Sequence, residues 1–164
     1  ALQDAIAKFD PQIILTVGQA GGRAEISLER IAINIDDYRI KDNEGNQPID
    51  EAIESNGPSA YWSTLPIKKM VEVLRANGIP ASVSNTAGTF LCNHTFYGLM
   101  HHLHMEGGKR RGGFIHIPYL PEQAARNPGQ PSMSLEMIVR GLEIGIEVAL
   151  TTIEDSKTTG GTIC

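Results

Sequence analysis

The stretch Ser82–Asn93 constrains the fold of this chain more than any other. It opens with small and β-branched residues, which are typical of a short buried strand. Gly88 then permits a turn that a residue with a Cβ would resist. Cys92 follows the turn, and apolar residues recur after it at spacings of three and four, which predicts a helix. These apolar residues are Phe96, Leu99, Met100 and Leu103.

Cys92 falls in the first turn of this expected helix. Unpaired backbone N–H groups and the positive end of the helix dipole favour an anion at that position. A thiolate is stabilised there, so Cys92 is a candidate nucleophile. Most free cysteines are instead small buried hydrophobic residues, and the stretch taken alone favours that interpretation. Other parts of the sequence are needed to choose between the two.

Apolar strands and amphipathic helices alternate along the rest of the chain. Residues 13–17 form a continuous apolar run, which is typical of a strand covered on both faces. Helices interleaved with such strands predict an α/β fold, a three-layer α/β/α sandwich with a mostly parallel sheet. Further strands are expected at residues 26–34 and 113–118, and helices at residues 1–9, 61–77 and 132–154.

Residues 61–77 show the clearest helical pattern. Thr64 is expected to cap this helix, and Pro66 suits its first turn. Segments rich in glycine, proline or charge are expected to lack regular structure. They are a long polar loop at residues 36–57, a solvated basic turn at 109–113, a proline-rich loop at 121–131 and a flexible tail at 155–164. A loop as long as the first of these is often functional.

Length and composition fit one globular domain that covers all 164 residues. The net charge of −5 gives no basic footprint for nucleic acid. No apolar run approaches the length that spans a bilayer. The two cysteines are Cys92 and Cys164, and Cys164 ends a polar tail, so no disulfide is expected between them. An unpaired interior cysteine suits a reducing cytoplasm.

The five histidines fall into two groups. Four lie on the helix after Cys92, and they are expected at the surface because no carboxylate or cysteine accompanies them at a recognised metal-ligand spacing. These four are His94, His101, His102 and His104. His116 differs because apolar neighbours surround it on an expected strand. It is either a hydrogen-bonded core histidine or a general base beside Cys92. The carboxyl ends of parallel strands meet at one edge of a sheet, so the turn before Cys92, the end of the His116 strand and the loop at Gln19 are expected to converge.

Three segments carry a family resemblance. They are residues 18–34 (GQAGGRAEISLERIAIN), residues 84–93 (SNTAGTFLCN) and residues 113–123 (GFIHIPYLPEQ). In this order they resemble the glutamate signature, the cysteine signature and the histidine segment of type I pyroglutamyl peptidase, also called pyrrolidone-carboxylate peptidase, a family of cysteine peptidases. The resemblance covers residues 11–150. Long motifs in the right order favour the nucleophile interpretation of Cys92 over the buried hydrophobic one.

The resemblance implies a thiol protease that removes an N-terminal pyroglutamyl residue from peptides through a thioester. Cys92 would be the nucleophile, His116 the general base and then acid, and Glu29 the group that orients the imidazole. Arg39 and the backbone N–H of Cys92 would stabilise the oxyanion. The lactam ring would occupy a slot formed by Gln19, Ile40, Phe90 and Leu91. The family also implies a homo-oligomer, a dimer or a tetramer, with no cofactor and no metal.

One departure from the family is visible. Family chains begin with a strand that leads into a Gly-Phe-x-Pro-Phe-Gly-Gly loop, whose aromatic residues help to hold the lactam ring. Residues 1–164 are expected to lack this strand and loop. Two alternatives therefore stay open. One is a truncated, non-catalytic homologue that keeps the triad without the ring clamp, and the other is a nucleoside- or phosphate-binding protein that uses the glycine loop at residues 18–22, although no nucleotide motif accompanies that loop.

Overall fold

The computed structural model describes residues 2–161. Its helices are α1 (Leu2–Phe9), α2 (Ile67–Ala76), α3 (Leu91–Met105), α4 (Pro121–Ala124) and α5 (Leu135–Thr151). Its strands are β1 (Ile13–Gln19), β2 (Ile26–Glu29), β3 (Ile31–Ile33), β4 (Ala60–Trp62), β5 (Ala81–Ser84) and β6 (Arg111–Ile117). Within these residues, no helix combines the length and the apolar character that crossing a bilayer requires.

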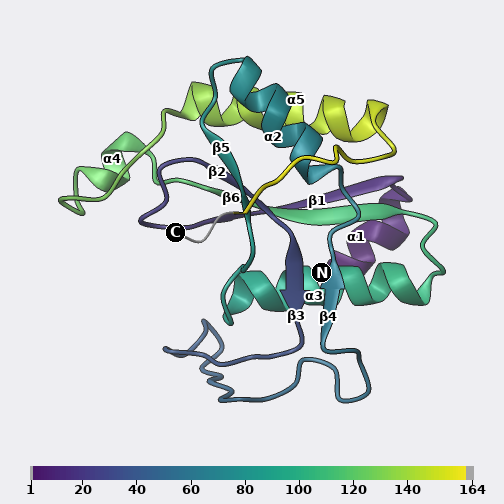
Figure 1. The fold of residues 1–164 in the computed structure, drawn as a ribbon. Coiled ribbons are helices and arrows are strands. Elements are labelled where there is room, and N and C mark those ends of the chain that lie inside the picture. The colour runs from purple at the N-terminus through teal and green to yellow at the C-terminus, as the bar shows by residue number, and fades with distance from the viewer. Residues whose placement is uncertain (1, 162–164) are drawn as a thin grey trace.

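The main sheet has the strand order β1-β6-β2-β5. β1 runs parallel to β6, and β2 runs parallel to β5, while β2 and β6 are antiparallel. Helices α2 and α5 cover one face of this sheet, and α1 and α3 cover the other (Figure 1). The predicted three-layer α/β/α sandwich with a mostly parallel sheet is therefore confirmed. The single antiparallel contact in its middle is not visible in the sequence pattern.

Each face of the sheet has its own apolar core. On one side, α2 buries the side chains of Ile67, Met70, Val71 and Leu74. On the other side, α3 buries Phe96, Leu99, Met100 and Leu103, the residues whose spacing predicted this helix. Burying a side chain of this size stabilises the fold by about 1.5–3 kcal/mol. These buried side chains are spread along α3, so packing fixes the position of the whole helix, its first turn included.

The helix predicted at residues 61–77 is wrong in its first third. Residues 60–62 form β4, which pairs antiparallel with β3, and the ring of Tyr61 lies 5.2 Å from that of Tyr97. The helix begins only at Ile67. Pairing with β3 and packing on α3 are contacts between distant segments, and they override the local helical pattern.

The expected cap of that helix is also wrong. The Thr64 hydroxyl accepts a hydrogen bond from Gly112 N at 2.8 Å instead of capping α2. Pro66 occupies the N-cap position and provides no side-chain hydrogen bond. The Asp155 carboxylate satisfies the helix end, since it accepts from the backbone N–H groups of Lys68 and Lys69. A residue 87 positions away along the chain thus supplies the cap.

Two strand predictions need correction. The expected strand at residues 26–34 is divided at Arg30 into β2 of the main sheet and β3 of a separate two-stranded sheet. The run at residues 13–17 is less covered than predicted. β1 is an edge strand of the sheet, and Val17 is 44% exposed. Apolar sequence alone does not distinguish an edge strand from a central one.

The loop at residues 36–57 contains no helix or strand, as expected. The basic turn at residues 109–113 is not simply solvated. Arg110 pairs with Asp10 and Glu106, and Arg111 begins β6 and donates to the carbonyls of Ala149 and Thr152. The proline-rich segment at residues 121–131 contains the short helix α4.

Residues 155–161 lack regular structure but make specific contacts. The hydroxyls of Ser156 and Thr158 donate to the Glu72 carboxylate, and the carbonyl of Gly160 accepts from Arg30. These hydrogen bonds argue against the flexibility expected for this part of the tail. Cys164, and with it the expectation about a disulfide, lies outside the described residues.

Candidate active site

Cys92 is the second residue of α3, as the sequence predicted. β5 ends at Ser84, Gly88 adopts a φ of +81°, and α3 follows with Phe90 at its N-cap. The Phe90 side chain makes no capping hydrogen bond. The first backbone N–H groups of α3 therefore favour negative charge at Cys92.

His116 lies near the end of β6 and is only 3% exposed. The parallel register of β1 and β6 places Gly18 opposite His116. A Cβ at Gly18 would lie 3.0 Å from Cys92 Sγ and 2.8 Å from the ring of Phe114. Glycine at position 18 thus leaves the space that the thiol occupies. These contacts bring Cys92 and His116 to the end of β1, but the predicted reason is wrong for Cys92. β2 and β5 run opposite to β1 and β6, so the carboxyl end of β5 lies at the other edge of the sheet, and the turn and the start of α3 carry Cys92 to the thiol site.

Glu29 reaches His116 from the antiparallel neighbour β2. Ser27 lies opposite His116 in the register, so Glu29, two residues later, lies diagonally across on the same face. Glu29 Oε1 is 2.7 Å from His116 Nδ1, and the Glu29 side chain is fully buried. The bond fixes the orientation of the imidazole ring and leaves the other ring nitrogen for Cys92.

The environment of His116 raises its pKa above the ordinary value of 6.5. Burial by itself lowers the pKa of this histidine, because it disfavours the charged ring. The hydrogen bonds to Cys92 and Glu29, together with the charges of these two groups, outweigh burial and favour the imidazolium. The site is thus arranged to hold a proton on His116 beside a thiol.

A pocket of about 250 Å³ adjoins the thiol. It is lined by Thr16, Val17, Gly18, Leu91, Cys92, Thr95 and Phe114. Most of this lining is apolar, and it lies between the outer strand β1 and the start of α3. Of the residues that the family resemblance suggested for substrate, only Leu91 is part of this lining.

Of the other suggested substrate residues, Phe90, Arg39 and Ile40 lie near the start of α3, and Gln19 lies at the end of β1. Phe90 packs edge-on against the buried ring of Tyr38, with the ring centroids 4.5 Å apart. Arg39 and Ile40 follow Tyr38 and are exposed. Gln19 Nε2 donates to Gln123 Oε1 at 2.6 Å, which ties the end of β1 to α4. Their roles toward a substrate stay predictions.

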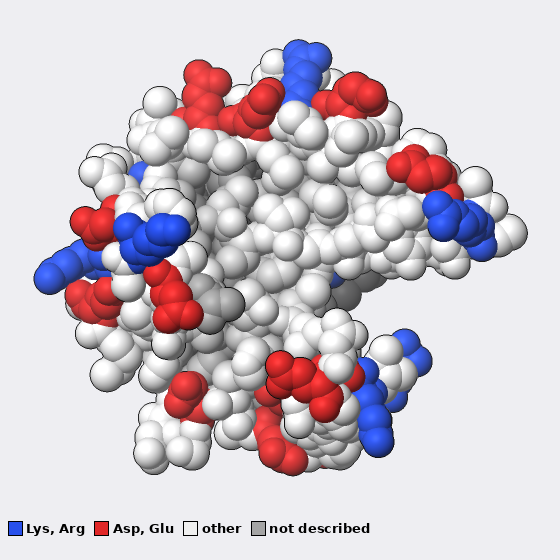
Figure 2. All heavy atoms as spheres, turned by 180° about the vertical axis from the view of Figure 1, so that it is seen from behind, with Lys and Arg blue, Asp and Glu red and all other residues white. Residues whose placement is uncertain are grey.

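The first residues of the loop at 36–57 are attached to the turn before Cys92. Asp37 N donates to Thr89 O at 3.0 Å, and the Thr89 hydroxyl donates back to Asp37 O at 2.9 Å. Figure 2 shows a hollow in the surface between the part of the molecule that contains α4 and the part formed by this loop. Acidic and basic side chains are interspersed around the rim of that view, without a basic stripe.

Two residues near the triad had no role in the sequence analysis. Arg23 Nη1 donates to Glu29 Oε1 at 2.7 Å. Asn93 is fully buried, accepts from Ile33 N, and donates to the carbonyls of Ile33 and Ile35. Asn93 therefore binds the first turn of α3 to β3. Both residues stand inside the family motifs, and that position is the only signal in the sequence that could have marked them.

The expectation of four surface histidines holds only in part. His94 and His104 are exposed, whereas His101 and His102 are half-buried. Carboxylates lie near two of these histidines, although no metal-ligand spacing in the sequence indicated it. His94 Nδ1 is 2.8 Å from Asp36 Oδ2, and His102 Nε2 is 3.6 Å from Glu106 Oε1. Across residues 2–161, no group of three or more His, Cys, Asp or Glu side chains could hold a metal ion.

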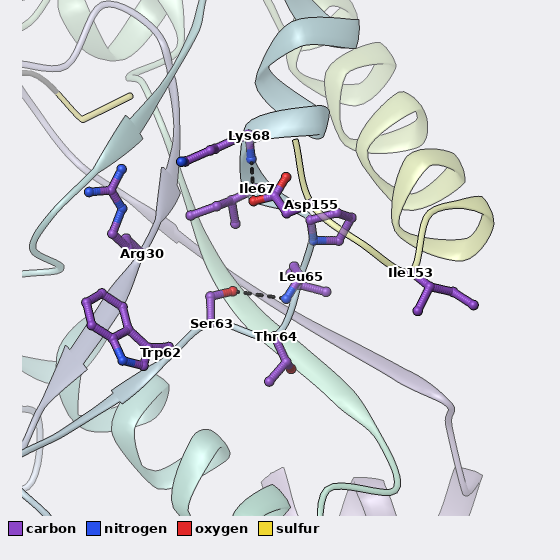
Figure 3. Close-up of a pocket in the computed structure, with 10 residues that line it drawn as sticks. Arg30, Trp62, Ser63, Thr64, Leu65, Ile67, Lys68, Ile153 and Asp155 are labelled. Atoms are coloured by element: carbon purple, nitrogen blue, oxygen red, sulfur yellow. Dashed lines mark hydrogen bonds between the residues drawn. The ribbon is translucent and has the colours of Figure 1, made fainter. Parts of the chain in front are cut away.

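A second pocket, of about 290 Å³, lies between the connection from β4 to α2 and residues 153–155 (Figure 3). Arg30, Trp62 and Lys68 are among its lining residues. None of Glu29, Cys92 and His116 lines it. This pocket is therefore separate from the one beside Cys92 at β1 and α3.

A cysteine at a helix N-terminus beside a buried histidine and carboxylate, on an α/β/α fold, is the arrangement of a cysteine hydrolase. Residues 1–152 match the family model of pyroglutamyl peptidase. The pyrrolidone-carboxylate peptidases of Bacillus cereus (strain Q1) and Cupriavidus taiwanensis are 58% and 60% identical to the chain. Each match covers 98% of the chain and 75% of the relative.

Solved structures agree with this match. Pyroglutamyl peptidase I from Bacillus amyloliquefaciens superposes with a TM-score of 0.94 at 52% identity, over 96% of the chain and 75% of that structure. Pyrrolidone carboxyl peptidase from Thermococcus litoralis superposes with a TM-score of 0.92 at 40% identity, over 96% of the chain and 76% of that structure. The chain belongs to the pyroglutamyl peptidase family of cysteine peptidases.

Proposed function

We propose that this chain removes an N-terminal pyroglutamyl residue from peptides, with Cys92 as nucleophile, His116 as general base and acid, and Glu29 as the orienting group. The observation that carries the proposal is the 2.7 Å bond between Glu29 Oε1 and His116 Nδ1, together with the influence of Cys92 on the pKa of the same imidazole. Family membership supplies the substrate class.

The reaction proceeds in two halves. The Cys92 thiolate attacks the carbonyl carbon of the pyroglutamyl residue, and the imidazolium of His116 gives its proton to the leaving amine as the C–N bond breaks. The product is a thioester between Cys92 and the pyroglutamyl group. Water then loses a proton to His116 and attacks the thioester, which releases pyroglutamate and restores the thiol. Glu29 holds the ring in one orientation throughout.

The oxyanion formed in each half requires donors aimed at it. The backbone N–H of Cys92 is one proposed donor, because it lies in the first turn of α3. Arg39 is the second, supported by the hydrogen bonds that attach the start of its loop to Thr89. Gln19, Ile40, Phe90 and Leu91 are proposed to enclose the lactam ring.

Hydrolysis of a pyroglutamyl arylamide tests the proposal directly. The chain is expected to cleave this substrate and to leave glutaminyl arylamide intact, because the open-chain amide carries a charged amine in place of the ring. Cleavage of both at the same rate would contradict lactam recognition. Cys92 is also expected to react with iodoacetamide faster than Cys164 near pH 6, as mass spectrometry of the labelled peptides would show. Fast labelling without hydrolysis would favour the alternative of a non-catalytic homologue.

We further propose that the protein self-associates and acts in the cytoplasm. Self-association is supported by the family resemblance and by large apolar side chains at the surface, among them Trp62 at 66% and Ile153 at 83% exposure. Sedimentation velocity at micromolar concentration is expected to show a dimer or tetramer, and a monomer alone would contradict it. A cytoplasmic location is supported by Cys92, which is a free thiol.

A further inference from the structure

One carboxylate oxygen at the site accepts two hydrogen bonds. Glu29 Oε1 is 2.7 Å from His116 Nδ1 and 2.7 Å from Arg23 Nη1. Arg23 Nη2 also donates to the carbonyl of Thr86, in the turn before Cys92, at 3.2 Å. A single guanidinium therefore joins the carboxylate behind His116 to the turn that leads to the nucleophile.

The surroundings of Glu29 make this contact important. The Glu29 side chain is fully buried, whereas the Arg23 side chain is 27% exposed. Glu29 Oε2 has no hydrogen-bond partner among the described residues. A buried carboxylate remains charged only if nearby groups compensate for the loss of water. Within the described chain, the charged or titratable groups bonded to Glu29 are Arg23 and His116, and only the arginine has a charge independent of the reaction.

We propose that Arg23 is a positioning residue for the reaction. It keeps the Glu29 carboxylate charged and aimed at His116 Nδ1, so that the other ring nitrogen serves Cys92. Arg23 acts through Glu29 and does not touch the reacting atoms. This inference rests on the proposed function, and it adds a fourth residue to the arrangement that prepares the thiol.

A purely structural role for Arg23 makes a different prediction. If the guanidinium only fastens the segment 20–25 to Thr86, its loss should lower stability and activity whether or not Glu29 carries a charge. If it acts through Glu29, its loss should matter only while the carboxylate is present. The two effects are separated by a double-mutant cycle.

The experiment compares wild type, Arg23→Gln, Glu29→Gln and the double variant on a pyroglutamyl arylamide. We expect Arg23→Gln to lower kcat by about 10- to 100-fold with KM changed by less than about threefold. In the Glu29→Gln background, the same change should cost less than about threefold. Arg23→Lys, which keeps the charge, should recover part of the loss. Arg126→Gln is the matched control, because Arg126 donates to the backbone carbonyl of Glu122.

A second measurement uses thiol chemistry and not turnover. The rate of Cys92 alkylation by iodoacetamide is followed against pH, with Cys164 as internal reference. Arg23→Gln should move the rise in the Cys92 rate to higher pH, because a less well compensated Glu29 supports the His116 imidazolium less. The groups that raise the pKa of His116 are Cys92 and Glu29, so the shift should vanish in Glu29→Gln. If the glutamine variant does not fold, Arg23→Lys is used in both assays and is expected to show the same changes to a smaller degree.

The outcomes distinguish failure of the proposed role of Arg23 from failure of the proposed function. Equal losses from Arg23→Gln with and without Glu29, or no loss at all, overturn the positioning role. An unshifted alkylation curve in Arg23→Gln also overturns it. If Glu29→Gln leaves both hydrolysis and alkylation unchanged, the proposed triad itself is wrong. A strong effect of Glu29→Gln with none from Arg23→Gln rejects only the inference about Arg23.

Discussion

Replacing Cys92 by serine is expected to lower kcat/KM for a pyroglutamyl arylamide by at least about 10⁴-fold. The nucleophile and the histidine act together, so loss of the nucleophile alone removes nearly all of the covalent catalysis. A serine hydroxyl has nearly the same shape as the thiol but ionises far less readily beside His116. The helix N-terminus and the imidazolium stabilise a thiolate well, and they are insufficient for an alkoxide.

The fold should tolerate this change. Cys92 is half-buried, and it borders the pocket at β1 and α3. We expect the thermal midpoint of Cys92→Ser to stay close to that of wild type, because the substitution creates no cavity and buries no unpaired charge. Cys164→Ser is the matched control and should keep full activity. Hydrolysis by Cys92→Ser at more than a tenth of the wild-type rate would reject the mechanism.

Replacing His116 by alanine is expected to lower kcat/KM by about 10³- to 10⁴-fold, because the base that ionises Cys92 and the acid that protonates the leaving amine are the same ring. Glu29→Gln should retain more activity than His116→Ala, since an amide still occupies the space and accepts from Nδ1. Steady-state kinetics of the two variants give this order directly. The reverse order would show that the carboxylate takes a larger part in the chemistry than orientation.

Stability should also depend on pH through His116. Its pKa in the folded protein lies above the ordinary value of 6.5, through its bonds to Cys92 and Glu29. The stabilisation that this gives is fully present below the unfolded value and is lost as the pH rises through the folded value. The free energy of unfolding of wild type relative to His116→Ala should therefore be larger at pH 6 than at pH 9. Urea titrations at the two pH values measure this difference, and a larger value at pH 9 would contradict the direction of the shift.

The sequence by itself determined the local parts of this protein. The glycine turn and the apolar spacing after Cys92 placed the cysteine at the start of a helix, because turn and helix propensities are properties of adjacent residues. The alternation of strands and helices predicted the α/β/α layers. The motifs around Glu29, Cys92 and His116 identified the family, and the structure bonds Glu29 to His116 and brings Cys92 close enough to influence the pKa of that histidine.

Only the tertiary structure decided how distant segments pair. The register that carries Glu29 to His116 requires β2 to run antiparallel to β6, and no pattern within either strand encodes the direction of its neighbour. Tyr61 and Trp62 form part of a strand, and not of a helix, because they pair with β3. The fold brings Arg23 within hydrogen-bonding distance of Glu29 and Thr86, which lie 6 and 63 positions away along the chain. Strand pairing and buried ion pairs depend on which surfaces meet after collapse, so these contacts, which complete the site, follow from packing and not from local sequence.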